Sequence, residues 1–345
     1  MYIFARKTFF KMKEVILAIE SSCDDTSAAV IIDKTIKSNI ILSQKNHSNY
    51  GGVVPEIASR EHQKKIIIAV KEAIKVSNIE KDNLDAVAFT LGPGLLGSLI
   101  VGCSFAKSMS YALNIPLIGV DHMKAHVLSN FLDKPFPNFP FLCLTVSGGH
   151  TQIVLVRDYL DMEIVGQTLD DAVGEAFDKS AKILGLEYPG GPIIDKLSKK
   201  GNPLRFKFSK SKVPNLDFSF SGTKTSILYY IKSEIKKDPH FIKDNLNDIA
   251  ASIQFILIEI LKDKLVKASK KFKISNIAIS GGVSSNSLLR SEIEKLKSIY
   301  SWDIFIPKTE YCTDNAAMIA MAAHYYFKKN KFVDLNITPN PRLHF

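Results

Sequence analysis

One local plan that occurs twice constrains the fold more than any other feature of this sequence. Residues 14–32, EVILAIESSCDDTSAAVII, form an apolar run, a short polar segment and a second apolar run. Residues 140–156, PFLCLTVSGGHTQIVLV, repeat the plan. Both polar segments are rich in turn-forming residues, so each region is predicted to be a β-hairpin. A chain of 345 residues is long for one hydrophobic core. The repeat therefore predicts a duplicated α/β protein with two lobes and a central nucleotide cleft.

Further elements follow from apolar spacing. Residues 274–296 are predicted to be a strand, a Gly-Gly turn and a helix starting near Leu288. Other helices are expected at about 60–77, 98–113, 121–131, 170–184, 245–271 and 314–328, and strands at 85–90 and 117–120. Residues 186–225 lack periodicity and are predicted to be a long connection. We expect a first lobe over 13–128, completed by 314–345, a second lobe over 129–313, and an N-terminal extension over 1–12.

Net charge, cysteine spacing and apolar content limit the classes of partner and the compartment that we expect for this protein. The net charge of +10 suits a polyanion such as RNA, but most cations are lysines, which an A·T-rich genome would also produce, so both explanations stay open. The densest basic stretch is 196–212. Four cysteines are widely spaced, which argues against a disulfide framework or a cysteine-bound zinc. No apolar run approaches the roughly 20 residues of a membrane helix, so we expect a cytoplasmic protein without a membrane partner.

Two glycine turns and one acidic turn are candidate ligand sites. Ser147-Gly148-Gly149 and Ser280-Gly281-Gly282 each follow an apolar strand, where consecutive backbone amides can hold an anion. Either turn alone is weak evidence, but together they favour one phosphate-bearing ligand. Asp24 and Asp25 either position a metal-bound phosphate or a water, or merely form the first hairpin turn. Asp178 and Asp195 flank Gly190-Gly191 and could accept hydrogen bonds from ribose hydroxyls.

A histidine pair is the candidate metal site. His122 and His126 are four residues apart and follow Asp121, the predicted N-cap, so both imidazoles share one helix face. Such a pair is more often structural than ligating, and a third ligand must come from elsewhere; Asp314 is the best candidate. Two histidines and a carboxylate suit iron(II) or zinc. A metalloprotease needs Glu after the first histidine, where this chain has Met123.

The motifs together resemble a known family. In chain order they are IESSCDDTS, VVPEIASREH, GPGLLGSL, DHMKAH, VSGGHTQI, DDAVGEAFDKSAKILGL, YPGGP, FSFSGTKT, ISGGVSSN and TDNAAMIA. Over residues 13 to about 328 they closely resemble the TsaD family, once labelled O-sialoglycoprotein endopeptidases. The resemblance implies the actin-like/Hsp70-like ATPase superfold. Only Thr145 and Thr223 depart from the expected pattern, standing where Leu is usual, together with the N-terminal extension.

The resemblance also implies a reaction and its parts. Threonylcarbamoyl-AMP would donate its acyl group to the adenosine at position 37 of tRNAs that read codons beginning with A, with release of AMP. His122, His126 and Asp314 would hold one divalent metal, iron(II) or alternatively zinc, and Asp24 and Asp25 are the catalytic candidates. The residues implied to bind the substrate are Thr145, Val146, Ser147, Gly148, Gly149, Asp178, Gly191, Asp195 and Asn286. Implied partners are tRNA, a TsaB-like paralogue on the first lobe and a TsaE-like ATPase.

Two other functions remain open from the sequence. An ATPase or sugar kinase of the same superfold would need the glycine turns but not the histidine pair. A non-catalytic scaffold would be expected to have degenerate ligand positions, whereas every such position here carries a suitable residue. Fold analogy alone does not separate these alternatives from the transferase.

Overall fold

The computed structural model describes residues 13–44, 47 and 50–345, which fall into two compact units. Unit 1 contains the described residues up to 47 together with 53–134 and 314–345, and unit 2 contains 135–313 with residues 50–52. The expected extension over 1–12 lies outside the described residues. Each unit is built around one five-stranded mixed sheet.

The sheet of unit 1 has the order β3-β2-β1-β4-β5. Its strands are β1 (Val15–Glu20), β2 (Asp25–Ile32), β3 (Thr35–Ser43), β4 (Ala86–Gly92) and β5 (Leu117–Asp121). The first three strands are antiparallel, and β4 and β5 run parallel to β1. The hairpin predicted over 14–32 is confirmed as β1 and β2. All six residues of β1 are buried, which explains its nearly continuous apolar sequence.

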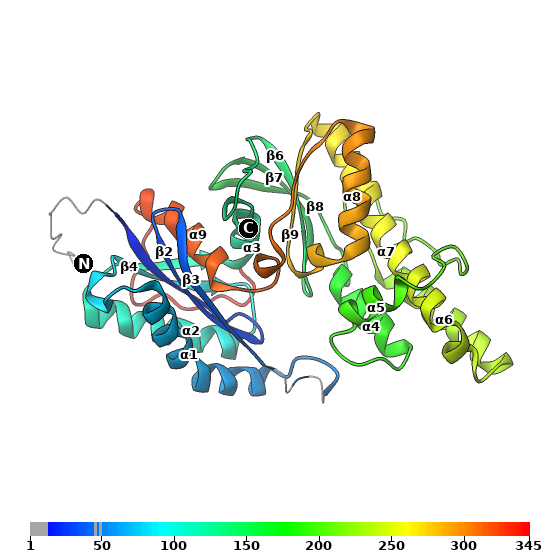
Figure 1. Ribbon diagram of the computed structural model, residues 1–345, viewed down its shortest axis with the longest axis horizontal. Helices are drawn as coiled ribbons and strands as arrows, with labels where there is room; N and C mark the ends of the chain where they lie inside the picture. Colours follow the sequence, from blue (N-terminus) through cyan, green and yellow to red (C-terminus); the bar gives the residue numbers. More distant parts are fainter. Residues whose placement is uncertain (1–12, 45–46, 48–49) are drawn as a thin grey trace. The chain divides into compact units, whose positions relative to one another are not determined.

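Helices cover both faces of this sheet. Helices α1 (Pro55–Ser77) and α2 (Leu96–Leu113) pack against each other on one face (Figure 1). Helix α9 (Ala316–Lys328) packs on β1 and β2 from the other face, beside the short α3 (His122–Leu128). Two 3₁₀ turns, Lys81–Asn83 and Ser129–Phe131, complete the regular elements described in this unit. Helix α9 brings the C-terminal part of the chain back to the first strands.

The sheet of unit 2 repeats the same topology. Its order is β10-β9-β6-β7-β8, with β6 (Phe141–Val146), β7 (Thr151–Asp158), β8 (Asp161–Gln167), β9 (Asn276–Ser280) and β10 (Asp303–Phe305). Read from its other edge, this is again an antiparallel meander of three strands followed by two parallel strands. The predicted hairpin over 140–156 and the predicted duplication are confirmed.

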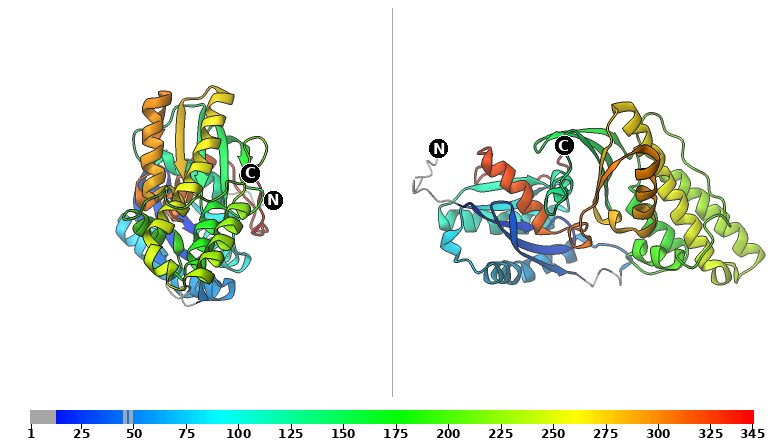
Figure 2. Two further views of the ribbon diagram at one scale, coloured as in Figure 1. Left: turned by 90° about the vertical axis from the view of Figure 1, so that its right-hand side faces the viewer. Right: turned by 45° about the horizontal axis from the view of Figure 1, so that its top comes forward.

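Helices of unit 2 cover its sheet and extend beyond it (Figure 2). They are α4 (Val173–Ile183), α5 (Gly190–Ser198), α6 (Ser221–Lys237), α7 (Phe241–Phe272) and α8 (Ser287–Tyr300), with 3₁₀ turns at Gly282–Ser285 and Thr309–Tyr311. Alternate residues of β6, Leu142, Leu144 and Val146, share one core with side chains of α4, α7 and α8. The period of two along the strand thus turns one sheet face towards these helices.

The predicted long connection over 186–225 is wrong in two places. Helix α5 begins at Gly190, so Gly190-Gly191 is a helix start and not a free turn. Helix α6 begins at Ser221. Both starts depend on remote carboxylates: Asp178 Oδ1 accepts from the amide nitrogens of Gly190 and Gly191 at 2.8 and 3.3 Å, and Asp170 Oδ1 accepts from the amide of Phe220 at 2.8 Å. Short-range sequence patterns do not reveal such caps.

The expectation that no segment could span a membrane needs a correction. Among the described residues, helix α2 has the length and apolar composition of a membrane span, with a mean hydropathy of 1.2. A core helix of a soluble protein passes the same test, and α2 contributes Cys103 and Ala106 to the core that it shares with the sheet of unit 1. Its apolar character is therefore weak evidence for a membrane.

Candidate functional site

The histidine pair lies where β5 passes directly into α3. Asp121, the last residue of β5, is the N-cap: its Oδ1 accepts from the amides of Met123 at 2.8 Å and Lys124 at 3.0 Å. The cap fixes the first helical turn, so His122 and His126 project from one face. Both side chains are buried, and their ring centroids are 4.6 Å apart.

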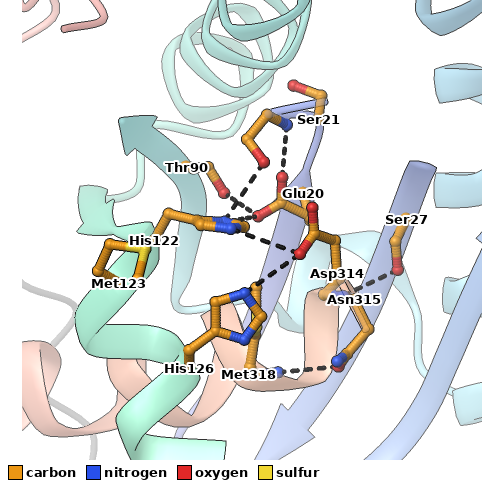
Figure 3. Close-up of polar contacts among 12 residues, drawn as sticks. Glu20, Ser21, Ser27, Thr90, His122, Met123, His126, Asp314, Asn315 and Met318 are labelled. Carbon is orange, nitrogen blue, oxygen red and sulfur yellow. Dashed lines mark hydrogen bonds and ion pairs between the residues drawn. The ribbon is translucent and has the colours of Figure 1, made fainter. Parts of the chain in front are cut away.

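Asp314 reaches this pair from far along the sequence (Figure 3). Its Oδ1 lies 3.2 Å from His126 Nε2 and 3.5 Å from His122 Nε2. The next residues hold it there, because Asn315 caps α9 at the amide of Met318, and the amide of Ala316 donates to Ser27 Oγ at 2.8 Å. One ligand atom from each of the three residues lies within 4.8 Å of the others. The structure thus brings the three predicted metal ligands together.

The donor set of this cluster fits a divalent cation. Two imidazole nitrogens and one carboxylate oxygen are borderline-to-hard ligands that leave coordination positions open. Burial would raise the pKa of Asp314, but His122 and His126 hold it below its usual range. Burial likewise opposes the charged form of His122, yet Glu20 and Asp314 raise its pKa well above the ordinary value. The cluster therefore favours a positive charge between its carboxylates.

Glu20 completes this cluster and was not singled out from the sequence. It is fully buried at the end of β1, and its Oε2 lies 3.0 Å from His122 Nδ1. Thr90 Oγ1 donates to the same oxygen at 2.7 Å, and the amide of Ser22 donates to Oε1. A charged residue directly after the apolar run VILAI was the available signal, because a buried carboxylate requires partners.

Ser22, His122 and Glu20 resemble a hydrolytic triad only superficially. Ser22 Oγ lies 3.3 Å from His122 Nδ1, the same nitrogen that faces Glu20. A triad histidine uses one nitrogen for the nucleophile and the other for the carboxylate. Here His122 cannot relay a proton from Ser22 to Glu20, so this arrangement does not activate a serine.

Asp24 and Asp25 lie in unit 1 at the turn between β1 and β2. Asp25 is the first residue of β2, and burial raises its pKa to about 6, with Asp24 and Asp314 adding to the effect. Buried His62 of α1 anchors the turn: its Nδ1 lies 2.8 Å from Thr26 Oγ1 and its Nε2 lies 3.0 Å from the Cys23 carbonyl oxygen. Hydrogen bonds therefore hold the turn, and burial raises the pKa of one of its carboxyls, that of Asp25, to about 6.

The first glycine turn of unit 2 follows β6. The Ser147 amide donates to the His150 carbonyl oxygen at 2.8 Å, which closes the turn. A Cβ on Gly148 or Gly149 would meet nothing within 4 Å, so both face open space. The start of α4 packs closely behind them, because a Cβ on Gly174 would come within 2.5 Å of the Ser147 carbonyl oxygen. The turn thus presents its backbone to solvent, whereas the first amides of α4 already have acceptors: the Gly174 amide donates to the Ser147 carbonyl oxygen at 3.3 Å, and the Val173 amide donates to Thr151 Oγ1 at 2.9 Å.

The second glycine turn follows β9, the parallel neighbour of β6. Gly281 has a φ of 86°, and a Cβ there would lie 2.3 Å from the Val146 carbonyl oxygen. Only glycine fits this backbone comfortably. The two turns therefore lie side by side at the ends of neighbouring strands.

The other predicted substrate residues also lie in unit 2, with differing surroundings. Asp195 Oδ1 accepts from Ser287 Oγ at 2.7 Å, beside Asn286, whose Oδ1 caps α8 at the amide of Leu289. Asp178 binds the helix start at Gly191, as described above. Thr145 is fully buried, and its Oγ1 accepts from Ser280 Oγ at 3.1 Å. The Thr145 side chain thus serves the core between β6 and β9.

Comparison with known proteins identifies the family. The family model for TsaD, tRNA N6-adenosine threonylcarbamoyltransferase, matches residues 35–321. A protein of that description from Christiangramia forsetii is 56% identical over 96% of this chain and 98% of its own length. One from Cytophaga hutchinsonii is 54% identical over 96% of this chain and 97% of its own length.

Solved structures show the same fold at low identity. Full-length HypF in a phosphate- and nucleotide-bound form matches 93% of this chain with a TM-score of 0.61 and 13% identity, and T. kodakarensis HypF matches 92% with a TM-score of 0.58 and 16% identity. This chain spans about half of either HypF chain, 47% and 48%. The likeness confirms the duplicated actin-like α/β fold, and with the near full-length sequence identities it shows that the chain belongs to the TsaD family of tRNA N6-adenosine threonylcarbamoyltransferases.

Proposed function

We propose that this protein transfers a threonylcarbamoyl group from threonylcarbamoyl-AMP to N6 of the adenosine at position 37 of tRNAs reading ANN codons. The observation that carries the proposal is the convergence of His122, His126 and Asp314 on one another within a chain of this family. An ATPase or a scaffold of the same fold has no need for such a cluster.

The cluster is proposed to hold one divalent cation, iron(II) in preference to zinc. Two histidines and one carboxylate with open positions are the donor set of non-haem iron(II) sites. When bound, the cation supplies a Lewis acid for the carbamoyl carbonyl oxygen. The ligands hold their donor atoms in place beforehand, since α3 and the start of α9 are both capped.

The glycine turns of unit 2 are proposed to bind the phosphate of the donor. Gly148 and Gly149 are exposed and offer backbone amides without side chains. Val146 and Ser147 belong to the same turn. Asp178, Gly191, Asp195 and Asn286 are proposed to bind the rest of the adenylate, and Thr145 supports the turn from the core. HypF, a chain of the same fold, has been solved with phosphate and nucleotide bound.

The chemistry requires no nucleophilic side chain. The donor is a mixed carbamic–phosphoric anhydride, so N6 attacks the carbamoyl carbon, the bond to the phosphate oxygen breaks, and AMP leaves. Correct alignment of N6 supplies much of the rate. We assign Asp25 to accept the proton that N6 loses, because its pKa of about 6 leaves it ionised but basic near neutrality. Asp24 stays a catalytic candidate beside it.

The partners follow the same family. A TsaB-like paralogue is proposed to bind unit 1 at the exposed apolar residues Ile67, Ile68, Leu96 and Ile100 of the adjoining helices α1 and α2. Ile68→Asp should then prevent complex formation in size-exclusion chromatography. Ile299→Asp, at an exposed residue of helix α8 in unit 2, is the matched control that should leave the complex intact.

A TsaE-like ATPase is a further implied partner. Because its substrate is tRNA, we propose that the protein acts in the cytoplasm.

The basic stretch 196–212 is proposed to contact the tRNA backbone. Three of its cations already pair with carboxylates: Lys199 with Asp195, Arg205 with Asp248, and Lys210 with Asp263. Within the part of the chain that the structure describes, Lys196, Lys200, Lys207 and Lys212 have no ion pair, so these four remain available for phosphates.

The decisive experiment is transfer of labelled threonine to tRNA by the purified protein, given the donor-forming synthase, bicarbonate, ATP and the partner proteins. We expect label in an anticodon-loop adenosine, and its loss in His126→Ala but not in His240→Ala, which alters an exposed histidine of unit 2. Full transfer by His126→Ala would remove the cluster from the mechanism. No transfer by the wild type, with partners competent alongside a known transferase, would favour the ATPase or scaffold.

A further inference from the structure

We propose that Glu20 is a positioning residue that aligns His122 for the cation. This inference rests on the proposed cation site, because it assigns a role to a side chain that touches only one of the ligands. Glu20 lies on the Nδ1 side of His122, and Asp314 lies on the Nε2 side (Figure 3). The carboxylate therefore holds the ring by the nitrogen that the cation does not use.

Glu20 is itself fixed by its surroundings. Thr90 Oγ1 on the neighbouring strand β4 donates to its Oε2 at 2.7 Å, and the amide of Ser22 donates to its Oε1. The His122 Nδ1–H is the third donor. A fully buried carboxylate is costly unless it is satisfied in this way. The three donors hold the Glu20 side chain in one orientation, and the Glu20 carboxylate in turn fixes the orientation of the His122 ring.

The two histidines differ in how their rings are held. Among the described residues, His126 Nδ1 is buried without a hydrogen-bond partner, so apart from the contact of its Nε2 with Asp314 that ring is oriented by packing. His122 Nδ1 contacts a carboxylate. A hydrogen bond from the remote nitrogen to a carboxylate fixes the tautomer of a metal-binding histidine and raises its basicity as a ligand. The alignment of the cluster therefore depends on Glu20 at one histidine only.

Replacing Glu20 by glutamine would oppose this alignment. The Ser22 amide can only donate, so it would retain the amide oxygen of the new side chain as its acceptor. The new NH₂ group would then point at His122 Nδ1 and could only donate to it, so Nδ1 would have to be the unprotonated nitrogen of the imidazole. The proton of the neutral ring would then lie on Nε2, the nitrogen that the cation requires. A change of a single atom thus sets the wrong tautomer without creating a cavity.

The same strand provides a matched control. Glu14, immediately before β1, is also buried and contacts His324 Nδ1, with Lys328 at 2.9 Å. It lies about 20 Å from Glu20 along the strand, and His324 belongs to no ligand cluster among the described residues. Glu14→Gln therefore breaks a buried Glu–His pair of the same chemistry away from the cation site.

The test measures Zn²⁺ affinity by competition with a chromophoric chelator, using the full chain. We expect Glu20→Gln to bind Zn²⁺ about 10–100-fold more weakly than wild type, and Glu14→Gln to bind within about twofold of it. In Zn²⁺-saturated wild type labelled with ¹⁵N-histidine, the His122 Nδ1–H proton should resonate far downfield, and Glu20→Gln should lose this shift. Wild-type affinity and an unchanged proton signal in Glu20→Gln would overturn the proposal.

A second variant keeps the test decisive if Glu20→Gln does not fold. Thr90→Val removes one donor to Glu20 at nearly constant volume and should weaken Zn²⁺ binding about 3–10-fold; unchanged affinity would count against the positioning role. His126→Ala separates the two proposals. If the wild type binds no better than His126→Ala, the cation site itself fails, whereas tight binding by both wild type and Glu20→Gln refutes only the role of Glu20.

Discussion

The central hairpins of the two sheets pair in the same way but carry opposite kinds of turn. In unit 1 the β1–β2 turn and its neighbours present side chains, with Glu20 and Asp25 beside the cluster of His122, His126 and Asp314. In unit 2 the β6–β7 turn presents backbone, because Gly148 and Gly149 have open space where side chains would be. Side-chain carboxylates and imidazoles attract cations, and bare amides attract anions. Duplication kept the scaffold, and the turns diverged in charge preference.

The largest effect is expected from removing a side chain in unit 1. His126→Ala deletes one of three ligand atoms and leaves Asp314 with a single imidazole. Bound cation should fall below about a tenth of the wild-type content, measured by metal analysis after dialysis, and transfer should fall with it. A cation content equal to that of the wild type would contradict the proposal that side chains of unit 1 bind the cation.

In unit 2 we expect the opposite kind of change, the addition of a side chain to a glycine turn, to be harmful. Gly281→Ala forces a Cβ to within 2.3 Å of the Val146 carbonyl at a φ of 86°, and should cost about 2–5 kcal/mol of unfolding free energy. Gly148→Ala has room for its Cβ and should change the unfolding free energy by less than about 0.5 kcal/mol, yet weaken AMP binding. Urea denaturation and calorimetric AMP titration measure the two effects. Equal loss of stability in both variants would contradict the open face of the first turn.

A pH-dependent gain is expected at Asp25. Its pKa of about 6 in the fold exceeds its usual 3.8, so the folded state binds this proton more tightly than the unfolded state. Stability from this group is complete below about pH 4 and is lost as the pH rises through about 6. Asp25→Asn cannot ionise and should be about 1–3 kcal/mol more stable than wild type at neutral pH, with no gain at about pH 4. Thermal melts of the cation-free protein at both pH values test this prediction. A higher stability of Asp25→Asn at acid pH only would contradict a raised pKa of Asp25 in the folded state.

The smallest effect should come from replacing Asn286, whose side chain already has two hydrogen-bond partners within unit 2. Its Oδ1 caps α8 and its Nδ2 donates to Gln254 Oε1 at 2.8 Å. Asn286→Ala should cost about 1–2 kcal/mol, whereas Asn286→Asp should keep the cap. If Asn286→Asp binds AMP as well as wild type, the residue supports unit 2 only through the helix start.

The sequence was most informative where the signal is local. The two hairpins, Asp121 as N-cap, and the histidine pair at helical spacing are all short-range patterns, and the structure has them. Helices α5 and α6 were missed because Gly190-Gly191-Pro192 and Ser221-Gly222 look like loop residues, and their caps come from Asp178 and Asp170. Strands β3 and β8 were missed because they are partly exposed edge strands with weak alternation. Glu20 was missed because two of its three donors, Thr90 on β4 and His122 on α3, are distant in the sequence.

The route of the chain gives the cation cluster an order of assembly. Unit 1 supplies His122 and His126 early, but Asp314 belongs to the segment that returns to unit 1 after the whole of residues 135–313. A ribosome therefore delivers the third ligand only after unit 2 has been synthesised. Nascent or truncated chains that stop before this return carry the two imidazoles without their carboxylate. Cation loading during biosynthesis would accordingly be a late event, and tight binding would mark molecules whose translation and folding have both reached their end.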